Sequence, residues 1–185
     1  MHIHITGASG SGCTTLAAAL AGDLGLRHLD ADSYYWMPTS PPFQVKRHPT
    51  ERLSLLSRDI QSSVGVVLSG SIVGWGAEIE DTFTLIVFLY LPAPIRVERL
   101  RRRELEKYGL IDEAFLEWAA LYDQGPPEGR SLGKHNAWLA LRTCPVLRLE
   151  MDESVDTRLR HIHAALPKPL LNQSANGRPS SPVTP

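Results

Sequence analysis

The sequence predicts an α/β fold built on a parallel β-sheet with helices on both faces. Segments of apolar and β-branched residues, such as 64–68 and 84–91, alternate along the chain with segments of helical composition. Strands that are apolar on both faces belong to sheets covered by helices on both sides, and such sheets are typically parallel. A length of 185 residues suits one domain of this kind with a well-buried core.

The composition narrows the class of protein further. Hydrophobic residues make up 43% of the chain and charged residues 21%, which is typical of a soluble globular protein. The formal net charge is -1, so we expect no general attraction to nucleic acid or to a membrane, and any anion site must be local. The N-terminus shows no secretory signal, and the two cysteines, Cys13 and Cys144, make neither a disulfide framework nor a metal motif. A cytoplasmic location is the expectation.

In the first half of the chain, short apolar strands are separated by segments of helical composition. Residues 14–24 are rich in alanine and leucine, which favours a helix, and Gly25 suits its C-terminus. Four prolines between residues 34 and 49 indicate an irregular loop. The expected elements are strands over 2–6, 27–29 and 64–68 and helices over 14–24 and 50–62.

The second half continues the alternation. Residues 84–91 are the richest apolar segment and predict a buried strand, whereas the basic segment after them predicts a helix. The expected elements are strands over 84–91 and 146–149 and helices over 94–108, 112–122, 131–141 and 152–166. Residues 167–185 are rich in proline, serine and asparagine, so we expect a disordered tail behind a domain that spans residues 1–166.

The most informative motif lies directly after the first expected strand. It opens a helix and reads Gly7-Ala8-Ser9-Gly10-Ser11-Gly12-Cys13-Thr14-Thr15. Glycines let backbone N–H groups turn toward a phosphate, and the helix N-terminus adds the positive end of its dipole. Thr14 occupies the position of the hydroxyl that binds Mg²⁺ in phosphate-binding loops. The motif therefore predicts a phosphate-binding loop rather than a glycine-rich turn without a ligand.

One position departs from the pattern Gly-x-x-x-x-Gly-Lys-Ser/Thr. Cys13 stands where the pattern has a lysine, which normally reaches the β- and γ-phosphates. A thiol supplies no positive charge, so either another cation takes over or phosphoryl transfer is weak or lost. A thiol at a helix N-terminus is also expected to be more acidic than usual, which leaves redox control open beside a small residue that merely fits the loop.

Two aspartates, Asp30 and Asp32, follow the second expected strand. Ligands of parallel α/β sheets bind beyond the carboxyl ends of the strands, so this pair is expected beside the phosphate loop. Such carboxylates can hold Mg²⁺ through water and accept a proton from a substrate hydroxyl. The alternative is a turn with a helix cap, which aspartate also favours. Together with Thr14, the two aspartates are the candidate metal ligands.

The helix expected over 94–108 is rich in arginine. Arg99 and Arg103 are four residues apart and share one face, and Arg96 extends the same stripe. These arginines either bind phosphates and replace the charge missing at Cys13, or form a solvated face paired with nearby glutamates.

Together these features resemble the superfamily of adenylate, shikimate and gluconate kinases, and also small P-loop proteins of the topology-modulation type. The resemblance rests on the phosphate loop, the Asp-x-Asp after the second strand and Arg99-x-x-x-Arg103, and it covers about residues 1–166. It implies a three-layer P-loop NTPase fold with a five-stranded parallel sheet of order 2-3-1-4-5. A lid-like helical region is expected over about residues 104–135, with Arg130 as a further candidate for phosphate contact.

The resemblance implies that the loop holds the phosphates of ATP and that Mg²⁺ is the metal. Its expected activity is transfer of the γ-phosphoryl group to a small nucleotide or hydroxyl metabolite, with Asp30, Asp32, Arg99 and Arg103 as catalytic residues. Ser69-Gly70-Ser71 does not match the Asp-Gly-x-Pro-Arg segment of adenylate kinases. The alternative is a nucleotide-binding sensor without transfer activity. In either case we expect a monomer or homodimer whose partners are a nucleotide and a small acceptor, with neither nucleic acid nor membrane.

Overall fold

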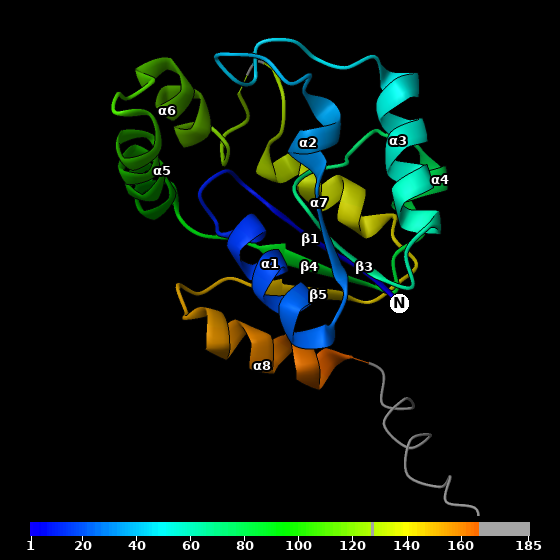
Figure 1. Cartoon of the computed structure of the whole chain (residues 1–185). Coiled ribbons are helices and arrows are strands. Elements are labelled where there is room, and N and C mark those ends of the chain that lie inside the picture. Colours follow the sequence, from blue (N-terminus) through cyan, green and yellow to red (C-terminus); the bar gives the residue numbers. More distant parts are fainter. Residues whose placement is uncertain (127, 167–185) are drawn as a thin grey trace, which may run out of the picture.

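The strands form a single five-stranded parallel sheet in the order β2-β3-β1-β4-β5, in a computed structural model that describes residues 1–126 and 128–166. This confirms the predicted fold class and strand order, and Figure 1 shows helices on both faces of the sheet. The strands are β1 (His2–Gly7), β2 (Arg27–Asp30), β3 (Val66–Ser69), β4 (Leu85–Leu89) and β5 (Val146–Leu149).

Eight helices connect the strands within the described residues: α1 (Cys13–Leu24), α2 (Ala31–Tyr35), α3 (Pro49–Gln61), α4 (Ala77–Glu80), α5 (Ala93–Tyr108), α6 (Glu113–Ala120), α7 (Leu132–Ala140) and α8 (Val155–Ala165). The sequence predicted six of them and missed the two shortest, α2 and α4. No helix in the described part of the chain combines the length and apolar character needed to cross a bilayer. The tail predicted over residues 167–185 lies outside the described residues.

The core has two halves, one on each face of the sheet. Side chains of β1 alternate between them, because successive residues of a strand point to opposite faces. Ile3 and Ile5 pack with Leu16 of α1 and Ile162 of α8 on one face. On the other face, strand residues pack against α3, α4 and α7, and the buried His4 ring lies beside Phe83 and Trp138. Figure 1 shows the same division, with α1 and α8 below the sheet and α3, α4 and α7 above it.

The parallel register brings the carboxyl ends of four strands to one edge of the sheet. Asp30 of β2 pairs with Ser69 of β3, Ser69 also pairs with Ile5 of β1, and Gly7 of β1 pairs with Leu89 of β4. The segments that follow these strands are the glycine-rich loop, the Asp-x-Asp pair and Ser69-Gly70-Ser71. The fold therefore gathers the motifs found in the sequence at a single edge.

Arg96 of α5 differs from its expected place in an exposed arginine stripe, because its side chain is completely buried. Its guanidinium group donates to the carbonyl oxygens of Leu91 at 2.8 Å and Ala119 at 3.0 Å and pairs with Asp123 at 3.4 Å. These bonds join the start of α5 to the end of α6. The predicted stripe is thus wrong for Arg96, which is a structural residue.

Candidate functional site

The loop between β1 and α1 has the backbone geometry of an anion site. Gly10 and Gly12 adopt positive φ angles of 82° and 98°, which residues with a side chain rarely adopt. A Cβ at Gly10 would lie 2.5 Å from the carbonyl oxygen of Arg96, so the loop also packs tightly against α5. Ala8 accepts hydrogen bonds from both the amide and the hydroxyl of Ser11, at 3.1 and 2.8 Å, which closes the turn.

The N-terminus of α1 is left open toward this loop. Gly12 at its start offers no side chain that could cap the helix, and the first turn, Cys13–Leu16, contains no acidic residue. The first amides of a helix have no partner within it, and the helix dipole makes them attractive to an anion. Thr14 and Thr15 are exposed in this turn. The predicted phosphate-binding residues, Gly7 to Thr15, therefore form one continuous loop and helix start, in which Thr14 and Thr15 are exposed whereas Gly7, Ala8 and Ser11 are buried.

Cys13 occupies this helix start with an uncharged side chain. Its Sγ lies 3.3 Å from Ser11 Oγ. Burial raises the pKa of the Cys13 thiol to about 11, and the hydrogen bond between Cys13 and Ser11 and the charges of Arg130 and Arg158 lower it only partly. The expectation of an unusually acidic thiol is therefore wrong, because desolvation of the thiolate outweighs the nearby positive charges.

Thr14, Asp30 and Asp32 come together beyond the ends of β1 and β2. Thr14 Oγ1 donates a hydrogen bond to Asp30 Oδ2 at 3.3 Å. The second oxygen of Asp30 accepts from the backbone N–H of Asp32 at 3.0 Å and so caps α2. Asp30 is thus both a helix cap and a neighbour of the phosphate loop. The two interpretations that the sequence left open are therefore compatible.

Asp32 lies between this pair and a nearby arginine. Its Oδ1 lies 3.9 Å from Arg130 Nη2. Desolvation raises the pKa of the Asp32 carboxyl, whereas the charges of Arg130 and Arg103 pull it down. The described part of the chain holds no group of three or more His, Cys, Asp or Glu side chains suited to a metal ion. Thr14 with one or two carboxylates fits Mg²⁺, which usually takes few protein ligands and completes its shell with phosphate and water oxygens.

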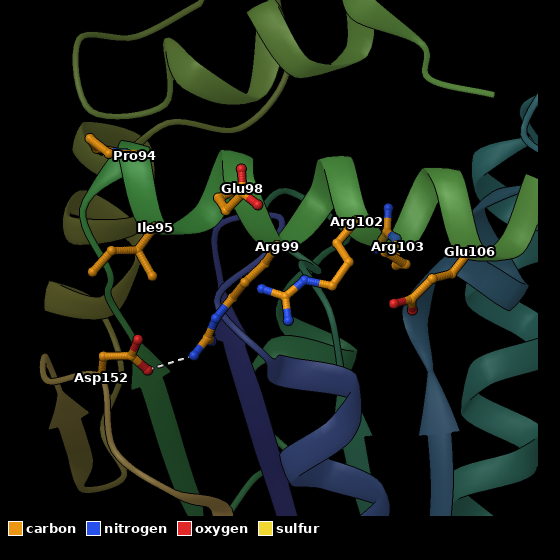
Figure 2. A pocket seen from close by; sticks show the side chains of 8 residues that line it. All are labelled: Pro94, Ile95, Glu98, Arg99, Arg102, Arg103, Glu106 and Asp152. Atoms are coloured by element: carbon orange, nitrogen blue, oxygen red, sulfur yellow. Dashed lines mark hydrogen bonds and ion pairs between the residues drawn. The ribbon is translucent and has the colours of Figure 1, made fainter. Parts of the chain in front are cut away.

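The predicted phosphate-binding arginines lie along α5, beside an open groove of about 670 Å³. Figure 2 shows this groove, in which Arg99 meets Asp152 of the β5–α8 connection at 2.5 Å. Arg99 also reaches the loop: its Nη1 lies 3.9 Å from the point that a Cβ of Gly12 would occupy. Arg103 is 53% exposed and pairs with Glu104, so the structure brings Arg99, but not Arg103, into contact with the loop.

Two hydrogen-bonded groups near the ends of β2 and β3 were not identified from the sequence. Ser71, just after β3, lies 3.0 Å from His135 Nε2, and His135 Nδ1 lies 2.6 Å from the hydroxyl of Tyr122. Burial lowers the pKa of His135 to about 4, so this ring is neutral near pH 7. His28 bonds to Ser69 at 3.0 Å. Sequence patterns do not show such pairs, because their members are far apart in the chain and meet only through the fold.

The segment around Gly70 packs closely against the start of α2. Gly70 has a φ of 99°, and a Cβ there would lie 3.0 Å from Ala31 Cβ and 3.7 Å from Asp30 Oδ1. The lid expected over about residues 104–135 stays a prediction; it contains α6 and Arg130.

Arg158 of α8 is the clearest residue that sequence reasoning missed. Its side chain donates to the carbonyl oxygen of Ser11 in the loop at 3.2 Å and to that of Met151 at 2.9 Å. The signal was present in the sequence: Arg158 lies four residues before Ile162, a fully buried residue of the same helix face. A charged residue on the apolar face of a helix indicates a buried partner or ligand.

Comparison with known sequences gives both full-length and partial matches. The chain is 43% identical over 171 residues to the Bacillus subtilis (strain 168) protein described as uncharacterized protein YqaC, covering 87% of this chain and 94% of that protein. It is 31% identical over 128 residues to the cytidylate kinase of Pyrococcus furiosus, a match that covers 63% of each protein. No family model matches the sequence.

Comparison with solved structures gives the same fold. The shikimate kinase from Acinetobacter baumannii, determined in complex with shikimate, aligns with a TM-score of 0.56 at 16% identity, over 89% of this chain and 91% of that one. A gluconokinase from Sinorhizobium meliloti 1021 aligns with a TM-score of 0.56 at 16% identity, over 88% and 89%. At these identities the similarity concerns the fold and not the substrate.

Proposed function

We propose that this chain, which belongs to the family of the Bacillus subtilis protein YqaC and has the fold of P-loop small-molecule kinases, is an ATP-dependent kinase. Its substrates are ATP with Mg²⁺ and a small nucleotide or hydroxyl metabolite. The observation that carries the proposal is the contact of Thr14 with Asp30 beside the open N-terminus of α1. A phosphate site, a metal-ligand set and a general base meet there within one edge of the sheet.

The residues divide the work of phosphoryl transfer. Backbone amides of the loop and of the first turn of α1 bind the phosphates of ATP. Thr14, Asp30 and Asp32 would hold Mg²⁺, which would neutralise phosphate charge. Asp30 accepts the proton of the acceptor hydroxyl while the oxygen of that hydroxyl forms a bond to the γ-phosphorus. The bond between that phosphorus and the β–γ bridging oxygen breaks, and ADP leaves. Arg99, which reaches the loop, stabilises charge on the phosphates, and Arg103, whose charge acts on Asp32, adds to this from farther along α5.

The test replaces the proposed base without disturbing the helix that it caps. Asparagine caps helices as well as aspartate does, so Asp30→Asn should keep α2 intact. We expect this variant to bind Mg-ATP within about threefold of wild type. Acceptor-dependent ADP release should fall about 100-fold or more, the usual loss when a general base is removed. The matched control is Asp23→Asn, at the far end of α1.

Acceptors for this assay follow from the proteins that the chain resembles. Cytidine monophosphate, shikimate and gluconate represent a phosphate acceptor and two hydroxyl acceptors. Turnover of one of them by wild type and not by Asp30→Asn supports the kinase. Equal turnover by both proteins would contradict the role of Asp30, and wild-type protein that binds no Mg-nucleotide would rule out the proposed function altogether.

A second candidate function is a nucleotide sensor that binds but does not transfer. The neutral Cys13 thiol favours it, because the site lacks a cation at the position that normally contacts the transferred phosphate. Binding of Mg-ATP without turnover across the acceptor panel identifies this case.

A further inference from the structure

Arg158 lies in the first half of α8 and points toward the phosphate loop. Its side chain is 3% exposed, although arginine is among the residues least often buried without a partner. The guanidinium group donates from Nη1 to Ser11 of the loop and from Nη2 to Met151. Both partners are neutral carbonyl groups, so neither compensates the positive charge that the fold has buried.

A second arginine stands at the same loop position. The point that a Cβ of Gly12 would occupy lies 3.4 Å from Nη1 of Arg158 and 3.9 Å from Nη1 of Arg99. Arg158 comes from α8 and Arg99 from α5, so two positive groups from different elements converge on the glycine that precedes Cys13. Arg99 has Asp152 as its counter-ion, at a position where both side chains are partly exposed.

The bonding of Arg158 is also incomplete. Its Nε is buried and has no hydrogen-bond partner within residues 1–126 and 128–166. Buried donors in native proteins are nearly always paired, and an exception commonly marks a place for a ligand or a water. Desolvation first, and then repulsion by Arg99, lowers the pKa of Arg158, although the charges of Asp152 and Glu153 partly offset this.

We propose that Arg158, together with Arg99, binds the phosphate oxygens of the nucleotide at Gly12 and supplies the positive charge that the loop lacks at Cys13. This rests on the proposed function, since it assumes that a nucleotide occupies the loop. The charge normally carried by the loop's own lysine comes here from α8, which packs on the same face of the sheet as α1. Arginine suits this task because its planar fork can bind a loop carbonyl and a phosphate at once.

The test is a double-mutant cycle measured as Mg-ADP affinity by calorimetry on the full chain. Arg158→Met keeps most of the side chain's bulk and removes its charge, and we expect it to weaken binding about 10- to 100-fold, as for loss of a charged hydrogen bond. Cys13→Lys in the presence of Arg158 should change affinity less than about threefold, because the charge is already supplied. Cys13→Lys in the Arg158→Met background should restore at least about tenfold of the loss.

The cycle separates a phosphate ligand from a structural clamp. A lysine at position 13 can replace a charge at the loop but cannot rebuild the bonds of Arg158 to Ser11 and Met151. Rescue by lysine therefore requires that charge at the loop is what Arg158 provides. The matched control is Arg160→Met, on the exposed side of α8, which should bind Mg-ADP as wild type does.

Two results with the folded Arg158→Met variant overturn the inference. Wild-type affinity in folded Arg158→Met, or a loss that lysine at position 13 does not rescue, shows that Arg158 is a clamp only. If Arg158→Met does not fold, the single variant Cys13→Lys still tests the inference. A tenfold or greater gain in Mg-ADP affinity would show that the wild-type loop lacks a cation and would overturn the inference. Absence of Mg-ADP binding by wild type instead removes the proposed function, which is a distinguishable failure.

Discussion

The thiol of Cys13 lies at the start of α1, where two electrostatic effects oppose each other. The helix N-terminus and nearby arginines favour the thiolate, whereas burial favours the neutral thiol. Burial prevails and raises the pKa to about 11. The position in the motif could be read from the sequence, but the degree of burial could not, because it depends on how α5 and α8 pack over the loop.

This balance predicts a thiol of low reactivity. In a Cys144→Ser background, we expect the rate of Cys13 alkylation in the native state to rise continuously with pH through pH 9, because the thiolate fraction keeps growing below the pKa of about 11. The rate is measured with a small alkylating reagent over a range of pH values. A rate that levels off near pH 7 would show an acidic thiol and restore the redox interpretation.

The arginines show what helical spacing predicts about side-chain position and what it does not. The motif Arg99-x-x-x-Arg103 was found from helical spacing, yet Arg99 reaches the loop and Arg103 does not, and Arg96 of the same stripe is buried. Spacing of four residues places side chains on one helix face, but it does not say where that face ends and the core begins. The spacing of Arg158 and Ile162 places Arg158 on the buried face of α8, but its partner Ser11 lies 147 residues away in the chain and could not be read from that spacing.

At the scale of elements, α5 and α6 form a pair held partly by one buried side chain. They share a small apolar cluster that contains Leu100, Leu116 and Ala119. Arg96 joins them by bonding to Leu91, Ala119 and Asp123. The helices were predicted from composition, whereas α2 and α4 were not, because helices of so few residues depend on tertiary contacts and caps such as Asp30 rather than on propensity.

We expect Arg96→Met to destabilise the protein by about 3–5 kcal/mol, because it leaves two buried carbonyl groups and Asp123 without their donor. The free energy of unfolding is measured by urea titration. Arg101→Met is the control, since Arg101 pairs with Glu113 on the surface and such pairs contribute little. Equal stability of the two variants would mean that the α5–α6 pair does not depend on Arg96.

At the scale of the whole molecule, the order of the strands was predictable and the distribution of charge inside the fold was not. The alternation of apolar strands with helices predicted a parallel sheet, and the resemblance to P-loop kinases implied the strand order 2-3-1-4-5; both were confirmed. The buried histidines follow from tertiary packing instead. His4 and His135 are both fully buried. Burial lowers their pKa values from 6.5 to about 3 and about 4.

These two histidines predict that the fold weakens in mild acid. Below pH 6.5 the unfolded chain takes up protons at both rings, whereas the folded protein does not until its own lower pKa values are reached. Stability is therefore complete above pH 6.5 and falls as the pH drops toward 4, by on the order of 1 kcal/mol per pH unit for each histidine.

Urea unfolding of wild type and His4→Phe at pH 7, 6 and 5 measures this effect. Phenylalanine keeps an aromatic ring beside Phe83 and Trp138 and cannot titrate, so the variant should lose stability with falling pH less steeply, by about one bound proton. Parallel pH dependences for the two proteins would show that His4 is not the group that titrates. A steeper loss in the variant would contradict the sign of the argument, because it requires an unfolded chain that binds more protons once a histidine has been removed.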